Sequence, residues 1–393
     1  MAGDSLLMAT WNIRAFGSLT EKWESEDGDS PRRDFHAAVL IAAVLERFDV
    51  VAVQEVKANL RALRHVLKKL GPDFGFLMTD VTYGDPGNDE RLAYIYDARR
   101  LKPSGLACEL VVPEDLDTPY ATPANAFQRQ FVRTPYAVSF NASGKTFVLV
   151  TLHIVYGEKG ADRVAELTAI AKWLRHWAES MDDYGQNLIC MGDFNIDRHG
   201  DPLWQAFTST GLVTAPGLEK VPRTLSSSVE HPDLSSFFDQ IAWFERRNDG
   251  KPYLSLKFRK AGGLNFQGVV LPHLNRTQLS WRISDHYPLW VEFGLAGSAR
   301  VVHALNRQVL IQSIVAVLDH RDAVLEFGVF IGGVDAAWLA LGGQFAGADA
   351  LTVFDGAVGG DFIGFEMLGF GLIGHVASPV GTGLTTGRTA AGS

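Results

Sequence analysis

The chain has 393 residues, of which 47% are hydrophobic and 21% charged, so it can form one large globular domain with an additional segment, and default disorder is excluded. Its formal net charge of -9 argues against nonspecific nucleic-acid binding through a strong positive field, although a metal ion can supply positive charge locally. Two cysteines, Cys108 and Cys190, are too few for a disulfide framework or, alone, for a four-ligand zinc site.

The N-terminal residues 1–8 lack the basic and apolar segments of a secretory signal, which predicts a cytoplasmic protein. Short apolar runs that end at polar residues follow, and each is typical of a buried strand; they cover residues 6–10, 50–53, 148–152 and 188–191. Residues 162–179 carry apolar side chains at spacings of three and four, as in a helix, and 34–48 and 59–70 are further helical candidates. Residues 20–31 are acidic and contain glycine and serine, which predicts a surface loop.

The composition changes near residues 295–300, where a strand-like run gives way to small residues. We therefore expect a catalytic domain over 1–296 and a glycine-rich apolar extension over 297–393, with a helix-like segment at 301–318 and a flexible end from 381. The uncharged stretch after Glu366 is long enough to span a membrane, but its glycines, His375 and Pro379 argue against a spanning helix. A small packed unit or a contact surface for a protein partner is favoured, because apolar segments are costly to expose.

The polar residues at the strand ends are those that phosphate ester hydrolysis uses. Glu55 is a hard oxygen ligand suited to Mg²⁺ or Mn²⁺, although an acid after a strand is also common on protein surfaces. Asp193 and Asn195, two residues apart after Gly192, can face one side of an extended segment. Asp and Asn in a turn can equally be structural, so this tetrapeptide is only moderately specific.

Two histidines accompany these acids. His153 follows an apolar run, and His286 follows Asp285, with Asp239 as a remote carboxylate able to orient it. A single histidine is usually structural, but two of them among strand-end acids weaken that interpretation. Together these residues predict a metal-dependent phosphoesterase.

Eight short motifs occur in a characteristic order along the chain. They are Trp11-Asn12-Ile13-Arg14, Gln54-Glu55-Val56-Lys57, Glu90-Arg91, Arg133-Thr134-Pro135, Leu152-His153, Gly192-Asp193-Phe194-Asn195, Phe238-Asp239-Gln240-Ile241 and Ser284-Asp285-His286-Tyr287-Pro288. Through these motifs the chain resembles the endonuclease/exonuclease/phosphatase superfamily, and its deoxyribonuclease I-like members in particular, over about residues 5–294.

The resemblance implies an α/β fold, a four-layer sandwich of two packed, mainly antiparallel β-sheets flanked by helices, with a C-terminal extension of unknown fold. It also implies a role for each motif residue. Glu55 would be the main metal ligand, with Asn12 and Asp285 close to the metal or the phosphate. Glu90 would pair with His153, and Asp239 with His286. Asp193 would polarise the attacking water or steady the imidazole, and Asn195 would bond a phosphate oxygen, while the substrate would be contacted by Lys57, Arg133 and Asn12. The implied cofactor is Mg²⁺ or Mn²⁺.

The motifs resemble those of nucleases more than those of lipid or inositol phosphatases, so the leading hypothesis is hydrolysis of DNA by metal-assisted attack of water. Asn88 stands where the deoxyribonuclease pattern has a tyrosine, and Lys57 where it often has arginine, which loses bidentate phosphate geometry. These departures and the acidic balance keep a phosphatase or phosphodiesterase of inositol, lipid or other small phosphate esters as the alternative. A catalytically silent binding module is a third hypothesis, because the same fold can carry different functions.

Overall fold

The computed structural model describes residues 5–82, 88–110, 131–157, 160–180, 187–227, 235–247 and 250–295, together with five strands between residues 325 and 377. The chain divides into two compact units, Met1–Val302 and His303–Ser393, which are described separately below. The predicted helix at 301–318 and the predicted flexible end from 381 lie outside the described residues. The assignment of 1–296 as the catalytic domain stays a prediction.

The described residues of the first unit form two six-stranded β-sheets. Sheet A has the order β11 (Lys257–Gly263), β12 (Leu289–Gly294), β1 (Ser5–Phe16), β2 (Val50–Lys57), β4 (Glu90–Asp97), β3 (Phe74–Met78). Sheet B has the order β5 (Lys102–Glu109), β6 (Tyr136–Ala142), β7 (Lys145–His153), β8 (Leu188–Asp193), β10 (Asp239–Phe244), β9 (Leu212–Thr214). Each sheet has one parallel pair at its centre, β1–β2 and β7–β8, and its other neighbours are antiparallel.

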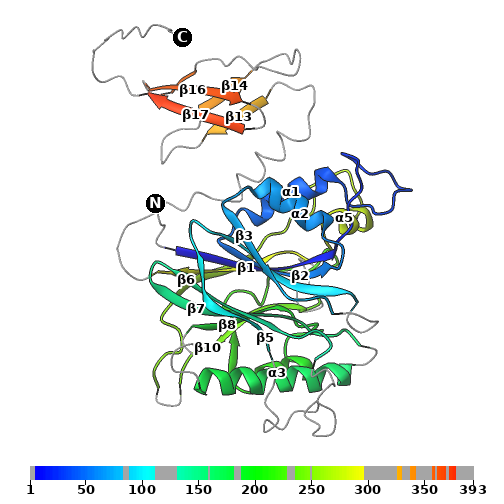
Figure 1. Ribbon diagram of the computed structural model, residues 1–393, viewed down its shortest axis with the longest axis vertical. Coiled ribbons are helices and arrows are strands. Elements are labelled where there is room, and N and C mark those ends of the chain that lie inside the picture. The colour runs from blue at the N-terminus through cyan, green and yellow to red at the C-terminus, as the bar shows by residue number, and fades with distance from the viewer. Residues whose placement is uncertain are drawn as a thin grey trace, which may run out of the picture. The chain divides into compact units, whose positions relative to one another are not determined.

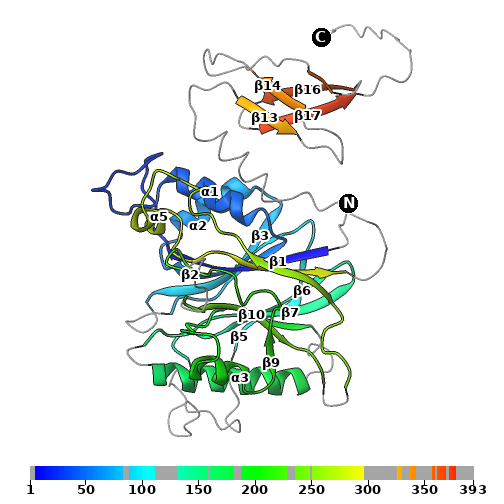
Figure 2. The same ribbon diagram turned by 180° about the vertical axis from the view of Figure 1, so that it is seen from behind.

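Helices cover the outer faces of the two sheets (Figures 1 and 2). The helices α1 (Phe35–Leu45) and α2 (Arg61–Leu70) lie over sheet A, and α3 (Gly160–Ser180) lies over sheet B near α4 (Pro202–Thr208). A fifth short helix, α5 (Arg276–Arg282), contacts β1. The predicted four-layer α/β sandwich of mainly antiparallel sheets is therefore confirmed.

The predicted helices form with slightly different bounds. The helix predicted at 34–48 begins after Asp34, whose carboxylate accepts a hydrogen bond from the Ala37 backbone N–H at 2.7 Å and caps the first turn. It ends at Leu45, and the next strand begins at Val50. Residues 20–31 form neither helix nor strand, as expected for a loop.

Alternation along the strands builds the core between the sheets. On β1, Leu6 and Met8 face this core, and on β8 Ile189 and Met191 do so from the opposite sheet. The intervening residues on these strands face outward toward the helices. Because side chains of a strand point alternately to its two faces, every second residue of each central strand belongs to the inter-sheet layer.

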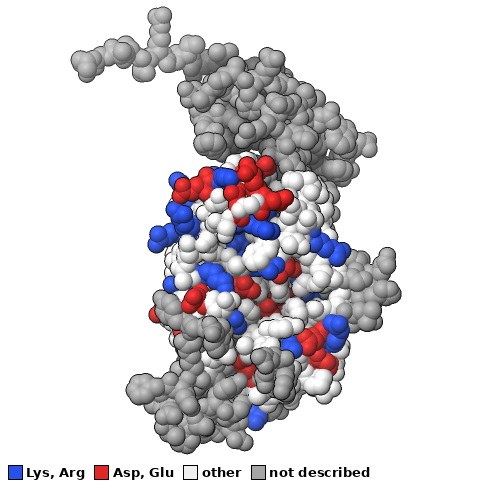
Figure 3. Space-filling model, turned by 90° about the vertical axis from the view of Figure 1, so that its right-hand side faces the viewer, with Lys and Arg blue, Asp and Glu red and all other residues white. Residues whose placement is uncertain are grey.

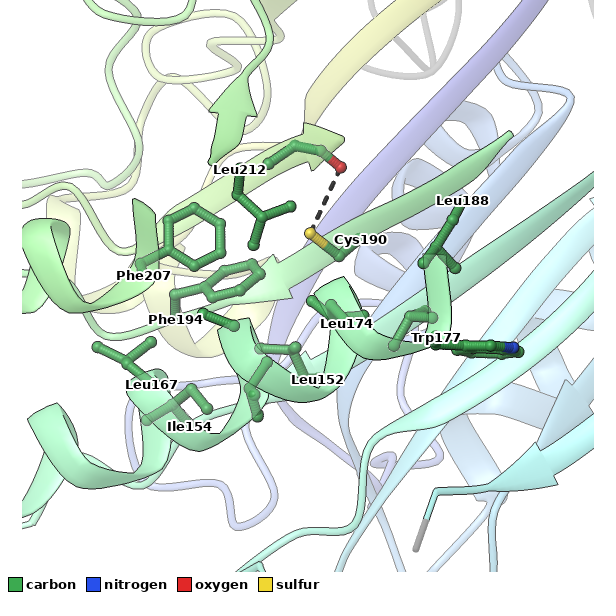
Figure 4. Packing of buried hydrophobic residues seen from close by; sticks show 14 of the residues in the cluster. Leu152, Ile154, Leu167, Leu174, Trp177, Leu188, Cys190, Phe194, Phe207 and Leu212 are labelled. Atoms are coloured by element: carbon green, nitrogen blue, oxygen red, sulfur yellow. Dashed lines mark hydrogen bonds between the residues drawn. The ribbon is translucent and has the colours of Figure 1, made fainter. Parts of the chain in front are cut away.

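A second core lies between sheet B and the helices α3 and α4. Figure 4 shows Leu152, Ile154 and Phe194 packed among side chains of these helices, including Leu167 and Phe207. Cys190 belongs to the same cluster; its thiol donates to the Ala242 carbonyl at 3.4 Å, and burial raises its pKa to about 12. Cys190 is therefore a packing residue.

The second unit consists of strands in its described parts. The strands β13 (Leu325–Val329) and β14 (Ala337–Leu341) form an antiparallel pair. The strands β15 (Gly356–Val358), β16 (Asp361–Leu368) and β17 (Gly371–Ala377) form a three-stranded antiparallel sheet, so the stretch after Glu366 enters a strand and not a helix. None of the helices in the described part of the chain combines the length and the apolar composition needed to cross a membrane.

Candidate active site

The inter-sheet alternation that builds the core continues beyond it into a polar cluster. On β1 the series of inward residues passes from Met8 to Thr10 and then Asn12. On β8 the series passes from Met191 to Asp193, and the other central strands repeat this change: it reaches His153 on β7, Asp239 on β10 and Glu90 on β4. These polar residues are 7% exposed or less, and the same pleat that buries the core places them between the two sheets at one end.

Glu90 is the centre of the first group of contacts. Its Oε1 lies 2.9 Å from Lys57 Nζ and accepts from Asn88 Nδ2 at 2.6 Å, while its Oε2 lies 2.7 Å from Arg133 Nε and 3.0 Å from His153 Nδ1. Burial by itself would raise the pKa of Glu90, but the hydrogen bond and charge of His153 and the charges of Arg133 and Lys57 lower it to about 2. An ionised Glu90 thus binds His153 through Nδ1 and leaves Nε2 directed toward Asp193.

Asp193 is the point where both histidines meet. Its Oδ2 lies 3.7 Å from His153 Nε2 and 3.9 Å from His286 Nε2, and it accepts a hydrogen bond from Asn12 Nδ2 at 2.9 Å. Its Oδ1 accepts from the Asn195 backbone N–H at 3.0 Å. Burial would raise its pKa, but the charges of both histidines and these hydrogen bonds lower it, so Asp193 is the anion that both imidazoles face.

His286 forms the second carboxylate–histidine pair. Its Nδ1 lies 2.7 Å from Asp239 Oδ2, and both side chains are buried. Burial would lower the pKa of His286, but the charge and hydrogen bond of Asp239, followed by the charge of Asp193, raise it. Asp239 therefore fixes the orientation of the ring, and Nε2 is left to face the centre of the site.

Glu55 departs from the alternation, and a backbone irregularity explains how. The pairing of β2 with β4 shifts register between Val53 and Val56, and Glu55 has φ 60°, in the left-handed region. Its Oε1 accepts from Asn12 Nδ2 at 3.2 Å, and its Oε2 accepts from the Ala15 backbone N–H at 2.8 Å. The bulge thus turns a carboxylate of sheet A toward the residue that also binds Asp193 of sheet B.

Two predicted site residues have other contacts. Asp285 pairs with Arg14 at 3.4 Å between Oδ2 and Nη1, and its side chain is 39% exposed, so it lies at the rim of the site. Asn195 donates from Nδ2 to the Ile154 carbonyl at 2.6 Å, which leaves one amide hydrogen for another acceptor. Asn88, an exposed residue at φ 55°, donates from its amide to Glu90.

Gly192 allows the two central strands of sheet B to approach here. In the parallel pairing of β7 with β8, Leu152 lies opposite Gly192 and His153 opposite Asp193. A Cβ atom at position 192 would lie 2.1 Å from the Leu152 carbonyl oxygen, and the backbone there has φ 155°. Only glycine permits this approach, which brings His153 beside Asp193.

Comparison with known proteins agrees with this architecture. The model of the endonuclease/exonuclease/phosphatase family matches residues 9–253, more than half of the chain. The chain belongs to the endonuclease/exonuclease/phosphatase family. As a member of this family it is a hydrolase of phosphoric ester bonds.

Individual relatives of this family cover most of the chain. A deoxyribonuclease from Thioalkalivibrio sp. (strain K90mix) is 27% identical over 298 residues, which are 73% of this chain and 71% of that protein. Among solved structures, a humanized TDP2 from D. rerio covers 74% of this chain and 100% of its own, with 14% identity and a TM-score of 0.47. A mannosyl-6-phosphatase from Bacteroides thetaiotaomicron covers 73% and 99%, with 19% identity and a TM-score of 0.47.

Enzymes of the endonuclease/exonuclease/phosphatase family use divalent metal ions, and the residues present fit such an ion. One ligand atom each of Glu55, Glu90 and His153 lies within 4.8 Å of the others, and the same holds for Asp193, Asp239 and His286. Asn12 Oδ1 is buried and has no hydrogen-bond partner among the described residues, although its Nδ2 has two. A buried amide oxygen without a hydrogen-bond partner and a neighbouring carboxylate are oxygen ligands of the kind that a hard cation such as Mg²⁺ binds.

Three buried charged residues that support the site were not predicted from the sequence. Arg33 donates to the carbonyls of Arg14 and Ala15, the latter at 2.8 Å, and so fixes the end of β1 beside Glu55. Arg163 donates to the Asn195 carbonyl at 2.6 Å. Glu166 lies near the Val155 backbone N–H, at 3.4 Å from Oε2. No motif marks these residues, and only their contacts in the folded chain reveal them.

Glu166 makes the stability of the protein dependent on pH. Burial raises its pKa to about 7, against the smaller lowering effects of the Val155 hydrogen bond and the Arg133 charge. The folded protein therefore retains a proton that the unfolded chain loses, and this stabilisation falls as the pH rises from about 4.5 to about 7. The variant Glu166→Gln should be more stable than the wild type by roughly 3 kcal/mol at pH 8 and similar at pH 4.5.

Urea unfolding at the two pH values measures this difference, with the exposed Glu46→Gln as control. An equal effect of Glu166→Gln at both pH values would contradict the assignment.

Proposed function

We propose that the protein is a Mg²⁺- or Mn²⁺-dependent phosphodiesterase that hydrolyses DNA by direct attack of water on phosphorus. The observation that carries the proposal is the convergence of two carboxylate–histidine pairs on Asp193, at 3.7 and 3.9 Å. The choice of DNA is supported by the relative named a deoxyribonuclease, at 27% identity.

The residues that would hold the metal ion are Glu55 and Asn12, with Asp285 at the rim. The ion, when bound, supplies positive charge that stabilises the phosphate oxygens as negative charge develops on them. Asn12 joins the two sheets through its hydrogen bonds to Glu55 and Asp193, so it keeps these carboxylates in a fixed relation. Both Glu55 and Asn12 belong to sheet A, and the Asn12 amide links this ligand pair to Asp193 of sheet B.

Proton transfer would fall to the groups around Asp193. The separations of 3.7 and 3.9 Å between its Oδ2 and the two Nε2 atoms are too long for direct hydrogen bonds, and they leave both imidazoles able to contact a phosphate oxygen or a water. Protonated His286, oriented by Asp239, would donate one hydrogen bond from Nε2 to that oxygen. Asp193 would polarise the attacking water, and the second Asn195 amide hydrogen would bond a phosphate oxygen.

Binding of the substrate phosphates would use Arg133 and Lys57. Both already contact Glu90, so the charge of two cations is opposed by one ionised carboxylate. These three side chains together carry one net positive charge, and the carboxylate of Glu55, within 4.8 Å of the Glu90 and His153 ligand atoms, adds a negative charge beside them. Figure 3, which faces the strand ends, shows basic and acidic side chains interspersed across this surface.

The test is hydrolysis of single- and double-stranded DNA, RNA and inositol phosphates with Mg²⁺, Mn²⁺ and EDTA. We expect metal-dependent cleavage of DNA, and we expect Glu55→Gln to lower it by about a hundredfold or more, because the neutral amide binds a hard cation weakly. Release of phosphate from inositol phosphates with no cleavage of DNA would replace the proposal with the small-ester alternative. Absence of turnover, with a melting temperature that does not respond to the metal ions, would instead support a silent binding module.

A further inference from the structure

Two exposed aromatic side chains lie at the rim of the active site. Tyr156 is 59% exposed and Trp281 is 38% exposed, whereas most large apolar residues of the described chain are buried. Tyr156 comes three residues after His153, and Trp281 comes five residues before His286. Neither ring is used in the hydrolytic chemistry described above. Trp23 and Phe76 are about as exposed, so the feature that sets Tyr156 and Trp281 apart is their place beside the two histidines.

Each of these rings rests on an arginine. The Arg14 Cζ lies 3.9 Å from the ring centroid of Trp281, and the Arg163 Cζ lies 4.9 Å from that of Tyr156. Both arginines are fixed: Arg14 bonds Ser280 and pairs with Asp285, while Arg163 is buried and bonds the Asn195 carbonyl. A guanidinium on one face holds each ring in place, which lowers the entropy lost when another ring stacks on its remaining surface.

A continuous series of contacts joins the two rings through the catalytic histidine. Phe238 stacks on His286 with centroids 5.9 Å apart, and Tyr156 meets Phe238 edge to face at 6.3 Å. On the other side, His286 adjoins Asp285, which pairs with the arginine beneath Trp281. The aromatic surfaces therefore belong to the same rim as the group that would contact the scissile phosphate.

We propose that Trp281 and Tyr156 stack unpaired nucleobases next to the scissile phosphate, so that the substrate is single-stranded DNA or a locally unpaired strand. The proposal rests on the proposed nuclease function. A phosphodiester in a nucleic acid has a planar base on each side, which matches two aromatic surfaces, whereas a small phosphate ester offers one group at most. Bases inside a duplex are already stacked and paired, so they reach flat side chains only after unpairing.

The experiment compares full-length wild type, Trp281→Ala, Tyr156→Ala and Trp281→Phe on a single-stranded oligonucleotide, its blunt duplex and an oligomer of abasic deoxyribose phosphates. Phe76→Ala is the matched control, because Phe76 is 43% exposed and pairs with Ile95, five residues along β4 from Glu90. We expect the wild type to prefer the single strand to the duplex. Each alanine variant should raise the KM for the single strand about tenfold, with kcat retained, and Trp281→Phe should recover most of this loss.

The oligomer without bases separates stacking from a structural role. If the rings bind bases, the ratio of kcat/KM on the base-bearing strand to that on the abasic oligomer falls about tenfold in each alanine variant. Equal losses on both oligomers, or a KM change no larger than that of Phe76→Ala, would overturn the inference. If the wild type cleaves no nucleic acid at all, the proposed nuclease function itself fails, which is a distinct result.

Discussion

The variant Asp193→Asn is expected to lower kcat/KM for phosphodiester hydrolysis by about a hundredfold or more. The change removes the negative charge that His153 and His286 both face, and it can place an amide N–H against Asn12 Nδ2, which now donates to Asp193 Oδ2 at 2.9 Å. The loss should appear in kcat, because in the proposed mechanism the affected groups act on the reacting oxygens.

Steady-state kinetics with saturating Mg²⁺ and a thermal melt provide the measurement. The control is Asp201→Asn, since Asp201 caps α4 through the Trp204 backbone N–H and asparagine caps helices equally well. Near-normal turnover of Asp193→Asn in a folded protein would mean that the convergence of the two histidines has no catalytic role.

The variant Gly192→Ala should reduce both stability and activity. Its Cβ would lie 2.1 Å from the Leu152 carbonyl oxygen and 3.0 Å from the Leu152 nitrogen, so β7 and β8 must separate. We expect the free energy of unfolding to fall by about 3 kcal/mol or more, because a backbone atom cannot yield as a flexible side chain does. The separation occurs beside His153 and Asp193, so turnover should fall by about a hundredfold as well.

A second glycine distinguishes this clash from backbone strain. Gly200 has φ 80°, and a Cβ there would meet nothing within 4 Å. The variant Gly200→Ala should therefore cost only about 1 kcal/mol and leave turnover unchanged. Chemical denaturation of the two variants decides the matter: equal losses of stability would show that the close approach of β7 and β8 is not what requires glycine at position 192.

The fold was predictable because the central strands follow simple alternation. Apolar runs ending at Asn12, His153 and Asp193 identify the strands, and the period of two places these side chains on the inter-sheet face. The order of the motifs supplied the rest of the architecture. The polar residues at the strand ends could therefore be predicted from the sequence, and the sheet topology explains why they lie close together.

Other parts of the site could not be predicted from local patterns. Glu55 reaches Asn12 only through a register shift and a left-handed backbone, neither of which has a sequence signature here. Asn88 donates from its amide to Glu90, and the supporting residues Arg33 and Arg163 contact carbonyl groups far away in the sequence. Such contacts depend on tertiary packing, and isolated residues do not reveal them.

Gln54 connects the two sheets just below the site. Its Nε2 lies 3.1 Å from Thr10 Oγ1 of sheet A and 2.9 Å from Thr151 Oγ1 of sheet B. Each sheet carries only part of the proposed catalytic set. A shift of one sheet relative to the other by a fraction of a residue would therefore misalign that set. The packing between the two sheets thus sets the distances within the proposed site. A change of side-chain volume deep in that layer can therefore alter turnover without touching a reacting group.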